Sequence, residues 1–142
     1  CQVYRGMKGQ YSSSDRAITA TRGRYLTSGG APAFTQFSSS SGGWTSYGGV
    51  GYLPHQQDPY DGWSGNPVHS WRVRVNEGRI EHRYPRIGDL KRIVVTDREG
   101  GGQWQGRVER MVLVGGRGRV AISGDEFRSI YGLRSSWFAP QV

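Results

Sequence analysis

The chain has 142 residues and a net charge of +8 at pH 7, with 19 lysines and arginines against 11 acidic residues. This length suits one domain with a modest hydrophobic core, or part of a larger domain. No apolar run approaches the roughly 20 residues of a transmembrane helix. The basic residues are scattered singly, which argues against a nucleic-acid-binding protein.

The first half of the chain alternates short candidate elements with glycine-rich turns. In chain order, we expect a strand at 2–6, a helix at 12–23 and two strands at 24–27 and 32–37. Ser13, Ser14 or Asp15 is expected to cap the helix, because a short polar side chain can accept from its free N–H groups. The helix is expected to end at Gly23, and the two glycines at 29–30 to form the turn between the strands.

Residues 37–46, FSSSSGGWTS, form a serine-glycine loop, and a long ordered loop at 52–67 follows it. The hydroxyls offer donors and acceptors and Trp44 offers a flat apolar face, a combination that suits a sugar. Two alternatives remain open: a flexible linker, or a turn whose serines bond only to nearby backbone. The neighbouring aromatic residues argue against a free linker. Asp58 and Asp61 are typical of turn-forming residues.

The second half is more regular. We expect a strand at 71–75, a helical turn at 79–84, strands at 90–98, 106–116 and 118–123, and a closing strand at 133–138. Ser123 and Glu126 form a capping-box pair that opens a helix ending near Gly132. The predicted fold class is α+β, a strand-dominated body with two or three short helices.

Cysteine and histidine give little sign of a metal site. The chain has one cysteine, Cys1, and three widely spaced histidines, His55, His69 and His82. This spacing does not match the short ligand spacings of zinc sites. The histidines are therefore expected in turns or on the surface, and no metal is predicted.

Six segments carry motifs in a consistent order along the chain. They are CQVYRG (1–6), AITATRGRYL (17–26), FSSSSGGWT (37–45), YLPHQQDPYDG with NPVHSW (52–71), GRVERMVLVGG (106–116) and ISGDEFRSIYGLRSSWF (122–138). Together they span nearly the whole chain. The set resembles the SpoIID/LytB family, the stage II sporulation protein D and amidase-enhancer proteins of bacterial cell walls.

The resemblance implies a SpoIID-like fold, with residues 1–142 as the C-terminal part of such a domain. Residues 1–69 would hold the glycan site, and residues 70–142 would form a β-rich closing half. In sporulation members of the family, lytic transglycosylation uses one carboxylic acid, first as acid and then as base. The family's catalytic glutamate lies upstream of the CQVYRG motif, so neither a catalytic residue nor a cofactor is expected in this chain.

The implied function is binding of peptidoglycan glycan strands, with lytic transglycosylase activity when a preceding segment supplies the glutamate. A non-catalytic wall-binding or amidase-enhancing module is the alternative, and a basic nucleic-acid-binding protein is a weaker hypothesis. The expected substrate-binding residues are Gln2, Tyr4, Ser39, Ser40, Ser41, Gly42, Gly43, Thr45, Tyr52 and Asp58. Gln2 and Tyr4 share one face of a strand, which would equally suit a plain sheet surface.

The family also bears on location and on Cys1. The resemblance implies a secreted or cell-envelope protein of a bacterium. In such an oxidising setting Cys1 is expected to form a disulfide with a cysteine of the preceding segment, even if that segment is a separate N-terminal fragment.

Overall fold

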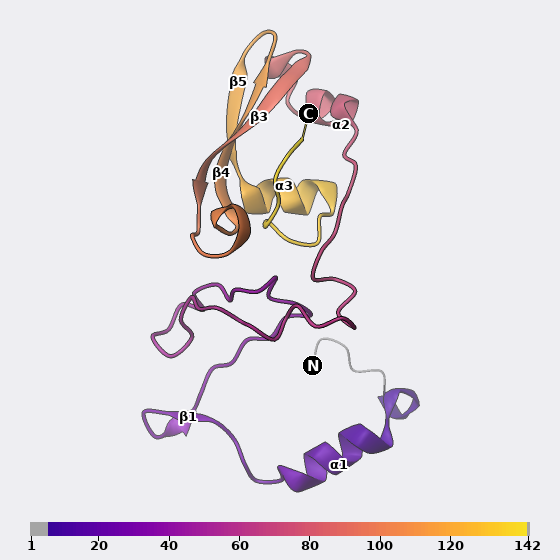
Figure 1. Cartoon of the computed structure of the whole chain (residues 1–142), viewed down its shortest axis with the longest axis vertical. Helices are drawn as coiled ribbons and strands as arrows, with labels where there is room; N and C mark the ends of the chain where they lie inside the picture. The colour runs from indigo at the N-terminus through magenta and orange to yellow at the C-terminus, as the bar shows by residue number, and fades with distance from the viewer. Residues whose placement is uncertain (1–5, 142) are drawn as a thin grey trace. The chain divides into compact units, whose positions relative to one another are not determined.

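The computed structural model describes residues 6–141 and divides the chain into two compact units, Cys1–Gln36 and Phe37–Val142 (Figure 1). Its helices and antiparallel sheets confirm the predicted α+β class. The division after Gln36 differs from the sequence-based one after residue 69, because the serine-glycine loop belongs to the second unit. Cys1, Gln2 and Tyr4 lie outside the described residues, as does the expected strand except for Gly6, which begins a short 3-10 helix.

The first unit contains that 3-10 helix, η1 (Gly6–Gly9), and the predicted helix, α1 (Ser12–Ala20). The expected caps are wrong, because Ser13, Ser14 and Asp15 lie inside the helix. Tyr11 occupies the capping position without a side-chain hydrogen bond. Asp15 instead accepts two bonds from the Gln10 side-chain amide, at 3.0 and 3.1 Å.

The predicted turn of the first unit joins two strands that are much shorter than expected. Strand β1 (Thr27–Ser28) pairs antiparallel with β2 (Ala31–Pro32). Gly29 and Gly30 have φ angles of 58° and 81°, the positive values that a two-residue hairpin turn requires. In the described part of this unit no side chain is buried, so it has no hydrophobic core of its own.

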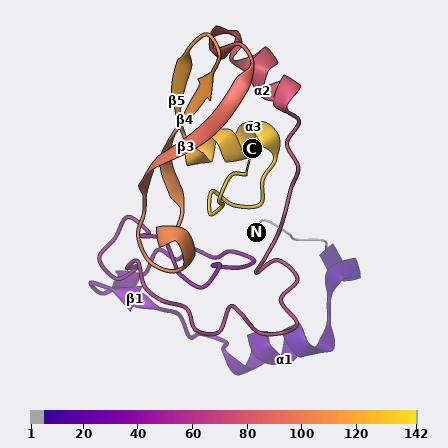
Figure 2. The ribbon, with the colours of Figure 1, turned by 45° about the horizontal axis from the view of Figure 1, so that its top comes forward.

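The second unit is built on a three-stranded antiparallel sheet in the order β3-β4-β5 (Figures 1 and 2). Strands β3 (Leu90–Arg98), β4 (Val108–Gly115) and β5 (Arg119–Ser123) confirm the three central strand predictions. Met111 and Leu113 alternate along β4 and are fully buried, which fixes one face of the sheet as the core face. Helix α3 (Gly124–Tyr131) covers this face with Phe127 and Tyr131.

Helix α3 begins and ends as predicted. The Ser123 hydroxyl accepts from the Glu126 backbone N–H at 3.0 Å, and Gly132 ends the helix in the left-handed conformation. The Glu126 carboxylate, however, accepts from the Tyr84 hydroxyl at 3.0 Å. Burial, together with this bond, raises the pKa of Tyr84 to about 12.

The predicted helical turn at 79–84 is a full short helix, α2 (Glu77–Arg83), followed by the 3-10 helix η2 (Pro85–Ile87). Helix α2 begins earlier than expected because the Asn76 side chain caps it and accepts from the Arg79 backbone N–H at 3.3 Å. Pro85 follows the helix and prevents its continuation.

The two outermost strand predictions, 71–75 and 133–138, are wrong. The alternation at 71–75 arises because Trp71 and Val75 pack against the core, but Val73 is 48% exposed and the segment pairs with no described strand. At 133–138 the backbone is irregular: Leu133 and Phe138 are buried and the Val108 N–H donates to the Ser136 carbonyl at 2.9 Å, but the segment forms no strand among the described residues. Apolar side chains can thus reach the core from a segment that pairs with no strand.

Among residues 6–141, no helix has both the length and the apolar character needed to cross a bilayer.

Candidate functional site

The segment that contains the serine-glycine loop has no helix and only one isolated β-bridge, between Trp44 and Gln57 (Figure 1). Around this bridge, residues 43–58 double back on themselves as an irregular hairpin. Thr45 secures it: its N–H donates to the Gln56 carbonyl at 2.9 Å, and its hydroxyl donates to the Pro54 carbonyl at 2.9 Å. Thr45, a predicted substrate residue, therefore bonds within the hairpin.

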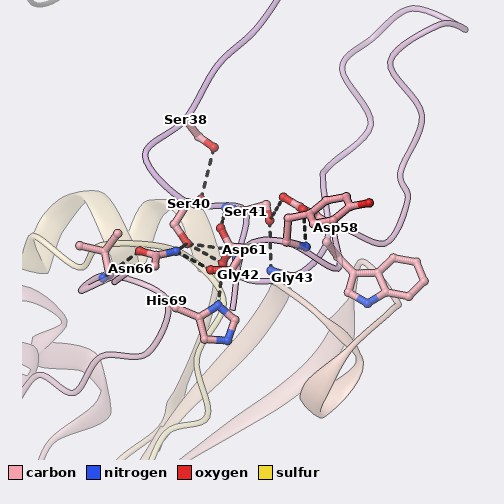
Figure 3. A network of polar contacts seen from close by, with 12 residues as sticks. Ser38, Ser40, Ser41, Gly42, Gly43, Asp58, Asp61, Asn66 and His69 are labelled. Atoms are coloured by element: carbon pink, nitrogen blue, oxygen red, sulfur yellow. Dashed lines mark hydrogen bonds and ion pairs between the residues drawn. The ribbon is translucent and has the colours of Figure 1, made fainter. Parts of the chain in front are cut away.

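Asp61 is the centre of a network of hydrogen bonds that shapes the serine-glycine loop (Figure 3). Its side chain is buried, and the residue is only 8% exposed. It accepts from the Ser40 hydroxyl at 2.8 Å, the Ser41 N–H at 2.7 Å and the Gly42 N–H at 3.1 Å. Residues 40–42 of the loop therefore fold around the Asp61 carboxylate, which satisfies two of their backbone N–H donors.

The same carboxylate lies 2.6 Å from Nδ1 of His69. Burial alone would raise the pKa of Asp61, but the hydrogen bonds from His69, Ser40 and Ser41 outweigh it and lower the pKa to about 2. The carboxylate is thus ionised at neutral pH and can only accept. Nδ1 of His69 must then carry the proton, which leaves Nε2 as the free ring nitrogen.

A second carboxylate, Asp58, holds the next part of the loop. It accepts from the Ser41 hydroxyl at 2.8 Å and from the Tyr60 N–H at 3.1 Å, while its own N–H donates to the Gly43 carbonyl at 2.9 Å. The hydroxyl hydrogens of Ser40 and Ser41 are therefore committed to carboxylates inside the protein. This agrees with the alternative that the serines serve the loop itself: their hydroxyls donate to carboxylates, and their oxygens accept from the nearby backbone N–H groups of Gly42 at 3.3 Å and Gly43 at 3.1 Å.

A cavity of about 820 Å³ lies beside this network. Its lining combines three indole rings with several serines, two arginines and one histidine. The lining residues are Ser38, Ser39, Ser40, Ser41, Gly42, Val68, His69, Ser70, Trp71, Arg72, Gln103, Trp104, Arg134, Ser135 and Trp137. None of them is an aspartate or a glutamate.

Arg107, the residue that precedes the central strand β4, attaches the loop to the β-rich body. Its guanidinium donates to the carbonyl oxygens of Ser41 at 2.7 Å and Trp44 at 3.1 Å, and it forms an ion pair with Glu99 at 3.0 Å. It also lies over the Trp137 ring, 5.2 Å from the ring centroid. One side chain thus fixes both the loop and an indole of the cavity wall.

Gly42 lets the loop approach Trp137 closely. Its φ of 73° lies in the left-handed region, and a Cβ at this position would be 3.0 Å from Cε3 of Trp137. Any larger residue would therefore strain the backbone and push against the indole.

Trp104 reaches the cavity from the turn between β3 and β4, where the short 3-10 helix η3 (Gln103–Gln105) lies. Its φ of 55° is unusual for an aromatic residue, and its side chain is 49% exposed. The turn is anchored by the Trp137 indole N–H, which donates to the Gln103 carbonyl at 2.8 Å. A strained backbone that presents an exposed indole is a common feature of binding sites.

The structure places the predicted substrate residues in two groups. Ser39, Ser40, Ser41 and Gly42 line the cavity, whereas Gly43, Thr45, Tyr52 and Asp58 do not. Gly43, Thr45 and Asp58 bond within the loop and hairpin. Tyr52 lies in the hairpin and is 45% exposed. Gln2 and Tyr4 lie outside the described residues.

The sequence-based prediction missed Asp61, His69 and Arg107, together with the indoles of Trp104 and Trp137. The sequence pattern around Asp61 is typical of a turn, and Arg107 is one of many scattered arginines. The one partial signal was tryptophan next to serine or glycine, which occurs at 70–71, 101–104 and 135–137 but also in the serine-glycine loop and at 62–65, whose tryptophans do not line the cavity.

The residues that the structure describes include no group of three His, Cys, Asp or Glu side chains suited to a metal ion. Comparison of the chain with protein-family models, curated proteins and solved structures found no match.

Proposed function

We propose that this chain binds peptidoglycan glycan strands, as the C-terminal part of a cell-wall domain like those of the SpoIID/LytB family. The observation that carries the proposal is the cavity, where the indoles of Trp71, Trp104 and Trp137 lie beside serine hydroxyls. A sugar ring has apolar faces, which stack on aromatic rings, and polar edges, which form hydrogen bonds. The cavity volume of about 820 Å³ lies within the range of ligand-binding clefts.

The serine hydroxyls that are available to a glycan differ from those that already form hydrogen bonds within the protein. Ser40 and Ser41 donate to Asp61 and Asp58, so they build the wall. Ser39 and Ser70 also line the cavity. We assign the polar contacts with a glycan to these two hydroxyls and to Nε2 of His69, whose side chain is 37% exposed.

We assign binding, and not catalysis, to these residues, because the described residues that line the cavity include no carboxylic acid. Lytic transglycosylation requires an acid that protonates the leaving oxygen and then acts as a base. In this proposal the acid comes from a preceding part of the domain, and a non-catalytic wall-binding or amidase-enhancing module remains the second candidate. Both place the protein outside the bacterial cell membrane or in the cell envelope.

The binding proposal is tested by co-sedimentation with purified, insoluble peptidoglycan at physiological salt. The variant Trp104→Ala removes an exposed indole that lines the cavity, and we expect it to weaken binding about tenfold. Trp63→Ala is the matched control, because Trp63 is 66% exposed and lies outside the cavity. Retention that is equal on cellulose, or unaffected by Trp104→Ala, would argue against the proposal.

Catalysis is tested separately by mass spectrometry of the soluble products. Residues 1–142 alone are expected to release no anhydro-MurNAc fragments from glycan strands. Release of such fragments would place the acid within this chain.

A further inference from the structure

Two arginines line the cavity, and each lies close in sequence to an indole of the same wall. Arg72 follows Trp71 directly, and Arg134 lies three residues before Trp137. In the part of the chain that the structure describes, neither guanidinium has a hydrogen-bond or ion-pair partner. The cavity lining therefore carries two positive charges that form no ion pair with a carboxylate of residues 6–141.

The carboxylates near the cavity are already occupied. Asp61 accepts from three groups of the loop and from His69, Asp58 accepts from Ser41 and Tyr60, and Glu99 is paired with Arg107. None of these three carboxylates belongs to the cavity lining. The lining itself combines two arginines with no acidic side chain, which favours a ligand that carries negative charge.

The chemistry of the arginine side chain indicates which negatively charged group the ligand carries. A guanidinium stays charged at all physiological pH values and presents a planar set of N–H donors that matches a carboxylate. The same cavity is lined by three indoles, which offer stacking surfaces. An acidic amino sugar has both features, an apolar ring face and a carboxylate on the same residue.

We propose that Arg72 and Arg134 bind the carboxylates of an acidic glycan, so that the cavity selects charged over neutral strands. This inference rests on the proposed function, because the sugar ring must stack on the indoles. In peptidoglycan the carboxylate has two sources: the lactyl group of MurNAc in strands without peptides, or the stem peptide in intact strands.

The test compares four soluble glycans by isothermal titration calorimetry with the 142-residue chain. They are peptide-free strands, the same strands with their carboxyl groups reduced to alcohols, peptide-bearing strands, and neutral GlcNAc oligosaccharides. We expect carboxyl reduction to weaken binding about three- to tenfold, the loss of one or two exposed charge-assisted hydrogen bonds. Tighter binding of peptide-free or of peptide-bearing strands assigns the carboxylate to the lactyl group or to the stem peptide, respectively.

Variants test whether the two arginines cause the preference for carboxylated over carboxyl-reduced strands. Arg72→Gln and Arg134→Gln are each expected to lower the affinity for carboxylated strands about three- to tenfold and to leave the affinity for reduced strands unchanged. Arg92→Gln is the control, since it removes the same charge from an exposed position of β3 outside the cavity. Melting temperatures are measured for all three variants to confirm that each one folds.

The outcomes separate this inference from the proposed function. Equal binding of carboxylated and reduced strands would overturn the role of the arginines and leave glycan binding intact. Absence of binding to every glycan would overturn both proposals. Tighter binding of a single-stranded oligonucleotide, lost in both arginine variants, would assign the positive charge to phosphate and overturn the carboxylate inference.

Discussion

Asparagine in place of Asp61 is expected to loosen the serine-glycine loop without unfolding the sheet. The carboxylate accepts from four donors, among them the backbone N–H groups of Ser41 and Gly42. Asparagine keeps one acceptor oxygen and turns an NH₂ group toward the remaining donors. A buried donor left unpaired costs about 1–3 kcal/mol, and water can reach part of this loop, so we expect a loss of about 2–4 kcal/mol.

The loss is measured by amide hydrogen exchange and by urea denaturation of the Asp61→Asn variant. The amides of Ser41 and Gly42 should lose protection, while those at the centre of β4 keep theirs. Asp97→Asn is the control, because Asp97 is an exposed aspartate of β3. Unchanged protection of both loop amides would refute the role of Asp61 as the anchor of the loop.

The pH dependence of stability provides an independent check on the same residue. The pKa of Asp61 is lowered from 3.8 to about 2, so its ionised form is the one that folding favours. The stability it contributes is therefore complete above about pH 4 and is lost as the pH falls toward 2. A shift of this size corresponds to about 2 kcal/mol, and the Asp61→Asn variant should lack that part of the acid-induced loss.

Two further substitutions test how the cavity wall is held. Arg107→Lys cannot maintain both loop carbonyl bonds and the contact with Trp137, so we expect a stability loss of about 1–2 kcal/mol in urea denaturation and weaker retention on peptidoglycan. A near-native result in both assays would show that the loop stays in place without this residue. Gly42→Ala should cost more in thermal melting than Gly43→Ala, because both have positive φ but only Gly42 would press a Cβ against Trp137. An equal loss of melting temperature in the two variants would mean that backbone strain, and not the contact with Trp137, determines the effect at Gly42.

The β-rich part of the fold could be predicted from the sequence because its local signals agree with each other. The apolar alternation at 90–98 and 106–116 coincides with real strand pairing, and Ser123 and Gly132 mark the two ends of α3. Segments 71–75 and 133–138 also place apolar side chains against the core, but from irregular backbone. Periodicity reports which side chains are buried, and it does not report whether a neighbouring strand is present.

The candidate site was predictable only in part, because its organising residues act over long distances in sequence. Asp61 bonds to residues about 20 positions earlier, and Arg107 bonds to Ser41, which lies 66 positions away. Such partners leave no local pattern. The serine-glycine loop itself was recognisable from composition, but composition did not show that Ser40 and Ser41 donate inward to carboxylates.

The central claim, that the cavity binds glycan strands, is tested most directly by the indole N–H signals in NMR spectra. The five tryptophans give five such signals, of which Trp71, Trp104 and Trp137 line the cavity, whereas Trp44 and Trp63 do not. On titration with a peptide-free GlcNAc–MurNAc oligosaccharide, we predict that the three cavity signals shift and that the Trp63 signal stays in place. Shifts confined to Trp44 and Trp63, or no shifts at saturating concentration, would contradict the claim.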